Sequence, residues 1–290
     1  MNPLSVCIRF SGLTFRFLFP EAVPLPDGFG ALLCEDPGQV NEQFEIRLLT
    51  VPLVPEGAPV ASHGGTNIYR TKKGWLRIYS PLIAEDGCQV ACLLCPDGKN
   101  ILYYPASRWG FYSAGLRLAH LVAGEVLLLR HDAFLLHSSL VMMDGKTVLF
   151  SGPSGAGKST QARLWEAHLG AKVLNGDRTV IMDREGTFYG GGSIWCGTSG
   201  IYHPEQAPIA GIFLVNQAPE NSVRRLGFQA FKPLMTQITV NSWDSAFMEK
   251  VTELLARLME TVPIYQLNCR PDADAARLGY QTLFGKEAPL

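Results

Sequence analysis

The stretch Gly152-Pro153-Ser154-Gly155-Ala156-Gly157-Lys158-Ser159-Thr160 decides how the second half of this chain is interpreted. It matches the spacing G-x-x-x-x-G-K-[ST] of a phosphate-binding loop at every fixed position. A short β-prone run, 147–150, precedes it, and 161–166 has the composition of a helix. A strand-loop-helix turn of this kind points backbone N–H groups and the positive end of a helix at one anion. The pattern therefore predicts a nucleotide site; the alternative is a glycine-rich turn that matches by chance.

The residue types in this loop have separate roles in such a site. The glycines allow φ > 0 and a close approach of the backbone to phosphate. Lys158 would reach the β- and γ-phosphates, and the hydroxyl of Ser159 would be a ligand of Mg²⁺. A nucleotide and Mg²⁺ are therefore the expected ligands of the loop.

Bulk composition excludes several other classes of function. The chain has 290 residues, 47% hydrophobic and 18% charged, with a net charge of −1. This balance predicts neither a nucleic-acid partner nor an acidic membrane surface. No apolar run approaches the roughly 20 residues that cross a bilayer. Near the N-terminus, Arg9 and Arg16 interrupt an alternating pattern that predicts a β-hairpin rather than a signal peptide, so we expect a cytoplasmic protein.

The cysteines leave two interpretations open. Seven cysteines form no evident pairing framework, which is typical of a reducing compartment. Cys88, Cys92 and Cys95 have the C-x3-C-x2-C spacing of radical-SAM iron–sulfur sites. The alternative is a buried strand over 89–94 in which cysteine acts as a small hydrophobic residue.

The pattern of elements changes along the chain. Residues 1–105 are predicted to form a β-rich domain that recognises the substrate or joins subunits, so a homo-oligomer is possible. A helix is expected over 107–129, with Leu116, Ala119, His120 and Ala123 on one face. Residues 106–290 then alternate strands (134–142, 146–150, 173–174, 209–215, 264–267) with helices (247–259, 272–284). This alternation predicts an α/β domain.

Two residues near the loop carry the remaining chemistry. Asp177 follows a short strand after the loop helix and could bind Mg²⁺ or accept a proton from an acceptor hydroxyl; otherwise it is an ordinary turn aspartate. His137 lies one strand before the strand that leads to the loop, and it could act in the site or simply belong to the core. Arg224 and Arg225 could clamp a phosphate or be solvated charges.

These segments together resemble a known family. Leu136-His137-Ser138-Ser139, the glycine-rich loop and Asn175-Gly176-Asp177-Arg178 are similar to the catalytic domain of HPr kinase/phosphorylase. The resemblance covers roughly residues 130–285 and includes the segments 190–197 and 207–214. It implies an α/β P-loop nucleotide-binding domain of the HPr kinase/phosphoenolpyruvate carboxykinase type, preceded by the smaller β-rich domain. Within that superfamily the chain looks most like divergent bacterial relatives, some of which phosphorylate a serine hydroxyl of a peptide.

The chain departs from the family in two ways. The family's paired aspartates correspond to Gly176-Asp177, so one carboxylate is missing. The roles of base and metal ligand then either fall on Asp177 alone or are shared with His137. The glycine-rich signature that HPr kinases carry after the catalytic segment is absent, which makes HPr an unexpected substrate. The expectation is an ATP-dependent serine kinase acting on a peptide or protein. The alternatives are a kinase for a small-molecule alcohol and a nucleotide-binding regulator without transfer activity.

Overall fold

The computed structural model describes residues 4–20, 29–112, 117 and 121–288. The chain folds into two compact units, Met1–Gly124 and Glu125–Leu290. Each unit contains one eight-stranded sheet, so the fold is mixed α/β with two multistranded sheets. The sequence places the change of architecture at 105/106, where the β-rich pattern ends.

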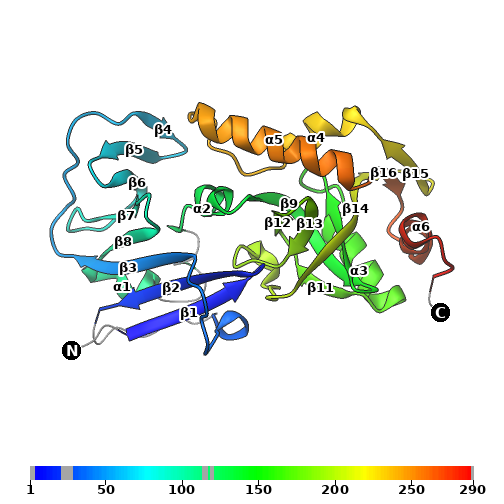
Figure 1. The fold of residues 1–290 in the computed structure, drawn as a ribbon, viewed down its shortest axis with the longest axis horizontal. Helices are drawn as coiled ribbons and strands as arrows, with labels where there is room; N and C mark the ends of the chain where they lie inside the picture. The colour runs from blue at the N-terminus through cyan, green and yellow to red at the C-terminus, as the bar shows by residue number, and fades with distance from the viewer. Residues whose placement is uncertain (1–3, 21–28, 113–116, 118–120, 289–290) are drawn as a thin grey trace. The chain divides into compact units, whose positions relative to one another are not determined.

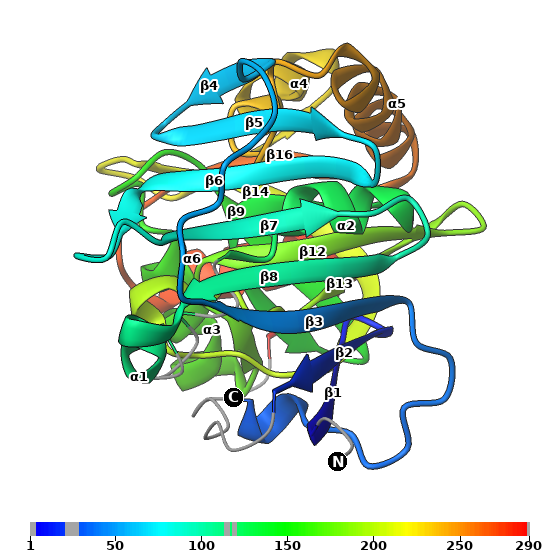
Figure 2. The same ribbon diagram turned by 90° about the vertical axis from the view of Figure 1, so that its left-hand side faces the viewer.

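The first unit is built on a single sheet (Figure 2). Its strands are β1 (Leu4–Phe10), β2 (Leu13–Phe19), β3 (Glu42–Leu49), β4 (Ala61–His63), β5 (Thr66–Thr71), β6 (Gly74–Ile83), β7 (Gln89–Leu94) and β8 (Lys99–Pro105). They are arranged in the order β1-β2-β3-β8-β7-β6-β5-β4. The predicted hairpin is confirmed as β1–β2, with Ser11 and Gly12 at φ 49° and 74° in its turn.

Aromatic side chains fill the core of this unit beneath β2 and β3. The ring of Phe17 stacks on Phe29 and Phe44 at centroid distances of 5.5 and 5.3 Å. All three side chains are buried. Period-two alternation in β2 sends Phe15, Phe17 and Phe19 to this side, which is why the pattern is readable in the sequence.

A helix is expected over 107–129, and the described residues of that segment form several shorter elements. A 3₁₀ turn (Ala106–Arg108), α1 (Trp109–Tyr112) and α2 (Gly124–Arg130) are found instead. Ala123 precedes α2 rather than lying within a helix, and Leu116, Ala119 and His120 lie outside the described residues. Helix interiors disfavour glycine, and Gly124 accordingly stands at the start of α2.

The second unit contains a closed circuit of strands. Its elements are β9 (Ala133–Met143), β10 (Lys146–Ser151), α3 (Lys158–Leu169), β11 (Lys172–Asn175), β12 (Arg178–Arg184), β13 (Thr187–Gly191), β14 (Gln206–Gln217), β15 (Ser222–Leu226), α4 (Phe231–Met235), α5 (Ser245–Thr261), β16 (Ile264–Cys269) and α6 (Ala273–Phe284). The order is β10-β9-β12-β13-β14-β16-β15, and β14 also pairs with β10. The long β14 makes this possible because it pairs first with β13, then with β10 and finally with β16.

Helices cover two faces of these strands (Figure 1). In β10, Val148 and Phe150 pack with Trp165 of α3 and Tyr280 of α6. The intervening Leu149 belongs to the other cluster, with α4 and α5. This alternation explains the continuous apolar run before the glycine-rich loop, because a strand with helices on both faces is buried on both.

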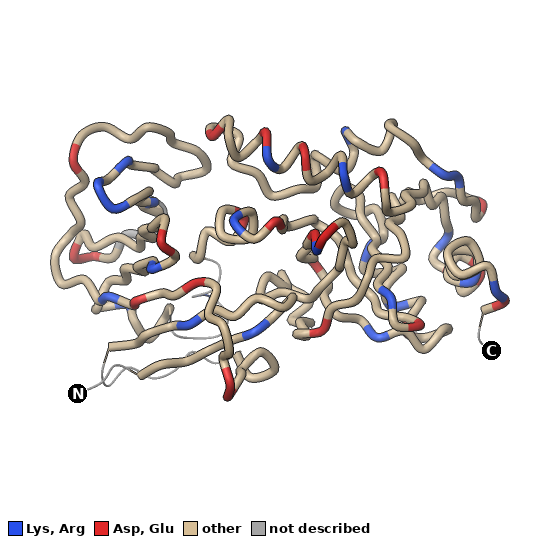
Figure 3. The backbone as a smooth tube through the Cα atoms, viewed as in Figure 1, with Lys and Arg blue, Asp and Glu red and all other residues tan. Residues whose placement is uncertain are grey.

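Most elements of the second unit are where the sequence predicts them, including α5, α6 and the β9–β10 hairpin. The hairpin β12–β13 and the edge strand β15 are additional. Basic and acidic residues are interspersed over both units (Figure 3). Within the part of the chain that is described, no helix combines the length and the apolar content that a bilayer crossing requires.

Candidate active site

The glycine-rich loop (152–160) connects β10 directly to α3, as the spacing predicts. Gly152, Gly155 and Gly157 have φ values of 141°, 78° and 104°, where side chains are strained. A Cβ on Gly152 would also lie 3.1 Å from the carbonyl oxygen of Val215 in β14. Gly157 is the N-cap of α3 and provides no side-chain cap, so the first N–H groups of the helix are directed at the loop, where an anion can bind.

Lys158, the first residue of α3, is buried against this loop. Its Nζ donates to the carbonyl oxygens of Gly152 at 2.9 Å and Pro153 at 3.0 Å. Burial lowers the pKa of Lys158 below its ordinary value, and the negative charge of Asp177 opposes that shift. A buried ammonium held only by carbonyl oxygens favours an anion nearby.

His137 and Asp177 come together where β9 changes its pairing partner. The first half of β9 pairs with β12, with His137 opposite Arg178, and the second half pairs with β11. The turn 176–177 lies between β11 and β12, and Ser138 N donates to Asp177 O at 3.0 Å. This switch sets His137 Nε2 3.5 Å from Asp177 Oδ1, with each side chain about one-third exposed (33% and 30%).

The backbone of Asp177 is fixed by a buried asparagine. The side-chain oxygen of Asn175 accepts from Asp177 N at 2.9 Å and Arg178 N at 2.8 Å. Its amide nitrogen donates to Ser193 O at 3.1 Å, so Asn175 is held from both sides. Gly197 abuts the carboxylate, since a Cβ there would lie 2.8 Å from Asp177 Cγ. The aspartate is thus positioned by its surroundings as well as by the turn.

The charges around His137 favour its neutral form. Burial lowers its pKa below the ordinary 6.5, and the positive charge of Lys158 adds to that effect. The carboxylate of Asp177 opposes it, and Arg178 lowers the pKa further. A neutral imidazole beside a carboxylate can accept a proton near neutral pH.

A short hydrogen-bonded path links the loop to the aspartate turn. Ser159 is exposed, and its Oγ lies 3.4 Å from Ser139 Oγ. Ser139 in turn donates to the carbonyl oxygen of Gly176 at 3.2 Å. The site predicted from three separate segments of sequence is therefore brought together: His137, Lys158, Ser159 and Asp177 surround one end of the glycine-rich loop.

Gly176 has no room for a side chain. A Cβ at this position would lie 2.5 Å from the Cβ of Ser199. Ser199 Oγ is itself engaged, donating to Cys196 O at 2.6 Å and accepting from Ile201 N at 3.2 Å. The segment around Ser199 therefore fills the space beside the turn, and the turn keeps a single carboxylate.

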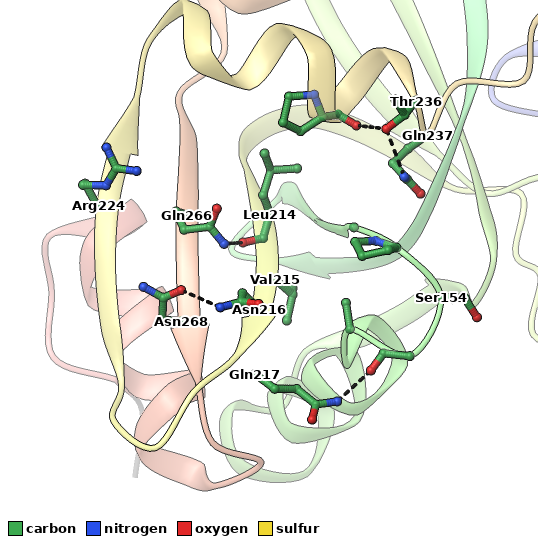
Figure 4. A pocket seen from close by; sticks show the side chains of 15 residues that line it. Ser154, Leu214, Val215, Asn216, Gln217, Arg224, Thr236, Gln237, Gln266 and Asn268 are labelled. Carbon is green, nitrogen blue, oxygen red and sulfur yellow. Dashed lines mark hydrogen bonds between the residues drawn. The ribbon is translucent and has the colours of Figure 1, made fainter.

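A cavity of about 760 Å³ adjoins the loop on the side of β14, β15 and β16 (Figure 4). Its lining is rich in amides, and several of these bond to one another or to backbone. Gln217 donates to Gly155 O at 2.7 Å, Gln266 to Leu214 O at 2.8 Å, and Asn216 to Asn268 at 3.1 Å. Of the two arginines considered from the sequence, Arg224 lines this cavity.

Arg225 instead lies near the Tyr265 ring, 6.0 Å from its centroid. The amides that line the cavity were not found from the sequence. Their signal was available, because Asn216, Gln217 and Asn268 stand at the carboxyl ends of strands parallel to β10, where ligands of α/β sheets bind.

The cysteines with radical-SAM spacing lie in the first unit. Cys88, Cys92 and Cys95 are buried around β7, which is the strand that the alternative interpretation predicts. Among the described residues, no group of three or more His, Cys, Asp or Glu side chains is arranged to hold a metal.

No protein-family model matches the sequence, and no curated protein matches it. Among solved structures, the HPr(Ser) kinase/phosphatase from Coxiella burnetii is similar, with 11% sequence identity and a TM-score of 0.27. The match covers 51% of this chain and 92% of that chain. A likeness at these values carries no conclusion about this chain, so its function is argued from its own site.

Proposed function

We propose that this chain is an ATP- and Mg²⁺-dependent kinase that transfers the γ-phosphoryl group to a hydroxyl, a serine of a peptide or protein. The observation that carries the proposal is the convergence of Lys158, Asp177 and His137 at one end of a glycine-rich loop. Phosphoryl transfer needs charge stabilisation, a metal ligand and a group that orients the acceptor. These three side chains and Ser159 are of the types that supply those functions.

The residues at this end of the loop fit Mg²⁺. The ion prefers oxygen ligands, usually one or two carboxylates together with water and phosphate oxygens. Ser159 offers an exposed hydroxyl, and the contacts of Asp177 with His137 and Arg178 are long, at 3.5 and 3.6 Å. The carboxylate oxygens therefore remain available. When bound, the ion would neutralise part of the charge on the β- and γ-phosphates.

Lys158 and Asp177 would act on opposite partners of the reaction. Lys158 would exchange its carbonyl partners on Gly152 and Pro153 for phosphate oxygens and hold the transferred group by charge. Asp177 would orient the acceptor hydroxyl or take its proton. The neutral His137 would contact the phosphate or adjust the position and reactivity of Asp177. The β-rich unit would recognise the substrate or join subunits.

One observation favours a second candidate, a nucleotide-binding regulator without transfer activity. Ser199 excludes a side chain at Gly176, so the turn presents one carboxylate where the resemblance leads us to expect two. A site with a glycine-rich phosphate-binding loop and one carboxylate can bind a nucleotide without aligning an acceptor hydroxyl. If the chain is such a regulator, it should bind ATP and form no phosphorylated product.

The acceptor class is tested with a panel of substrates. Purified protein, ATP and Mg²⁺ are incubated separately with serine-containing peptides, free amino acids and sugars, and product is measured by mass spectrometry. Phosphorylated serine in a peptide supports the proposal. Product only from a free amino acid or sugar would establish a small-molecule kinase. ATP binding without any product would favour the regulator.

A further inference from the structure

The segment that contains β15 and α4 carries an unbalanced charge. Residues 221–243 include the basic side chains Arg224, Arg225 and Lys232 and no aspartate or glutamate, although the whole chain has a net charge of −1. Arg225 lies near the Tyr265 ring. Arg224 and Lys232 are exposed, and no ion pair among the described residues involves either of them. This basic segment (221–243) therefore offers two cations to an anionic partner.

The basic segment also exposes an aromatic side chain. Phe228, in the 3₁₀ turn Phe228–Ala230, is 83% exposed, and its ring stacks on that of Phe231 in α4 at a centroid distance of 5.7 Å. Other residues attach the segment to the core, since Ala230 and Leu234 are buried in the cluster that includes α5. Phe228 is not needed for that packing. Exposed aromatic and arginine side chains are typical of protein-binding surfaces.

The basic segment borders the cavity of about 760 Å³ beside the glycine-rich loop. Figure 4 shows Arg224 on β15, and Thr236 and Gln237 after α4, among the residues that line it. Residues 152–156 of the loop belong to the same lining. The cavity therefore connects the exposed guanidinium of Arg224 to the loop, and a ligand bound along the basic segment can extend toward the loop.

The C-terminal part of the basic segment is hydrogen-bonded to the candidate active site. His137 N donates to Gln237 O at 2.8 Å. The guanidinium of Arg178, the residue after Asp177, donates to Thr239 Oγ1. The basic segment is thereby fixed to the strand and the turn that carry the proposed acceptor-orienting groups. A peptide bound along this segment is led toward the carboxylate of Asp177.

We propose that the basic segment docks the acceptor peptide, and that the preferred substrate carries aspartate or glutamate together with a large apolar residue near its acceptor serine. Phe228 and Phe231 would contact the apolar side chain, and Arg224 and Lys232 would attract the carboxylates. Exposed charges contribute to the choice of partner more than to affinity, whereas aromatic contacts supply much of the affinity. This inference rests on the proposed kinase and adds the chemistry of its substrate.

The test measures binding and transfer separately, with the full chain and synthetic serine peptides of equal length. The reference peptide carries Asp and Leu beside the serine; in one matched peptide Lys replaces Asp, and in another Gly replaces Leu. Binding of labelled peptides is followed by fluorescence anisotropy without nucleotide, and transfer by mass spectrometry with ATP and Mg²⁺. The reference peptide should bind about tenfold more tightly than either matched peptide. Added salt should reduce its advantage over the lysine peptide.

Two surface variants test the residues of the basic segment. Phe228→Ser should weaken binding of the reference peptide about tenfold, and Lys232→Gln about threefold. Each should raise the KM for that peptide and leave kcat and the KM for ATP unchanged, because neither side chain belongs to the reacting groups. Phe111→Ser and Lys146→Gln, which replace exposed residues elsewhere in the chain, are the matched controls and should bind the peptide normally.

Equal binding of the three peptides, or unchanged binding of the reference peptide in both Phe228→Ser and Lys232→Gln, would overturn the docking assignment. Transfer to a peptide serine would in that case still support the kinase. Preferential binding of the reference peptide without any phosphorylated product would overturn the kinase and keep the peptide-docking surface. A wild-type dimer that dissociates in Phe228→Ser, with peptide binding unchanged, would assign the surface to a second copy and overturn the proposal.

Discussion

His137 Nε2 lies 3.5 Å from Asp177 Oδ1 because β9 pairs with β12 up to His137 and with β11 beyond Ser139. The turn between β11 and β12 is thereby fixed beside β9, the hairpin partner of the strand that leads to the glycine-rich loop. Lys158 influences both partners electrostatically. The three groups therefore form one interacting unit, and changing one should alter the titration of another.

The titration of His137 tests this coupling. Its pKa should lie below 6.5 in the folded protein, should rise in Lys158→Met and should fall further in Asp177→Asn. NMR of the imidazole carbons measures each value, with Lys172→Met as the matched control. A His137 pKa that is unchanged by both substitutions would contradict its coupling to Lys158 and Asp177.

The same shift has a consequence for stability. Between the folded pKa of His137 and 6.5 the unfolded chain binds more protons, so stability rises with pH in that window. The contribution is present above pH 6.5 and is lost as the pH falls through the folded value. In His137→Gln, the free energy of unfolding measured in urea should depend less on pH across this range.

Asp177→Asn should separate binding from transfer. The amide keeps the size of the side chain but cannot take a proton, so the transfer rate should fall by about 10²- to 10⁴-fold while ATP still binds. Asp274→Asn, on the exposed start of α6, should leave the rate unchanged. An Asp177→Asn enzyme with normal turnover would remove this residue from the mechanism.

Gly176 and Ser199 should be energetically coupled. Gly176→Asp places a side chain against Ser199 and should lower the free energy of unfolding by about 1–3 kcal/mol. Ser199→Gly should lower it by about 1 kcal/mol through lost hydrogen bonds. The double variant should recover part of the first loss, measured in urea. Strictly additive effects on the free energy of unfolding would mean that Ser199 does not limit the size of the side chain at residue 176.

The local elements of this site are readable from the sequence. Nearly continuous apolar runs mark β9 and β10, and the spacing of glycines and Lys158 marks the loop. Gly170 ends α3 as its C-cap with φ 71°, a conformation that glycine adopts readily. Asn175-Gly176-Asp177 reads as a turn, and the structure has a turn there, stabilised by the Asn175 side chain. Each of these signals depends on neighbours within a few residues.

The rest depends on contacts between distant segments. The pairing of β10 with β14 brings Gln217 to the loop, and no local pattern predicts that register. Gln161 resembles a solvent-facing helix residue until β16 places Cys269 against it. The hairpin β12–β13 was missed because Gly190 and Gly191 weaken a strand pattern. In the structure, a Cβ on Gly190 would lie 2.7 Å from Thr147 Oγ1, so close packing requires glycine there.

The most direct test of the kinase proposal is transfer of label from γ-labelled ATP, with Mg²⁺ and lysate of the host, by the wild-type chain and by Lys158→Ala. Loss of Lys158 removes the charge that would stabilise the transferred group, so turnover should fall at least about 10²-fold with the fold intact. Lys250→Ala, whose ammonium pairs with Asp132 on the surface, is the control. A labelled peptide or protein that is absent with Lys158→Ala is the predicted result. Equal labelling by Lys158→Ala, or ATP binding with no labelled product, would contradict it.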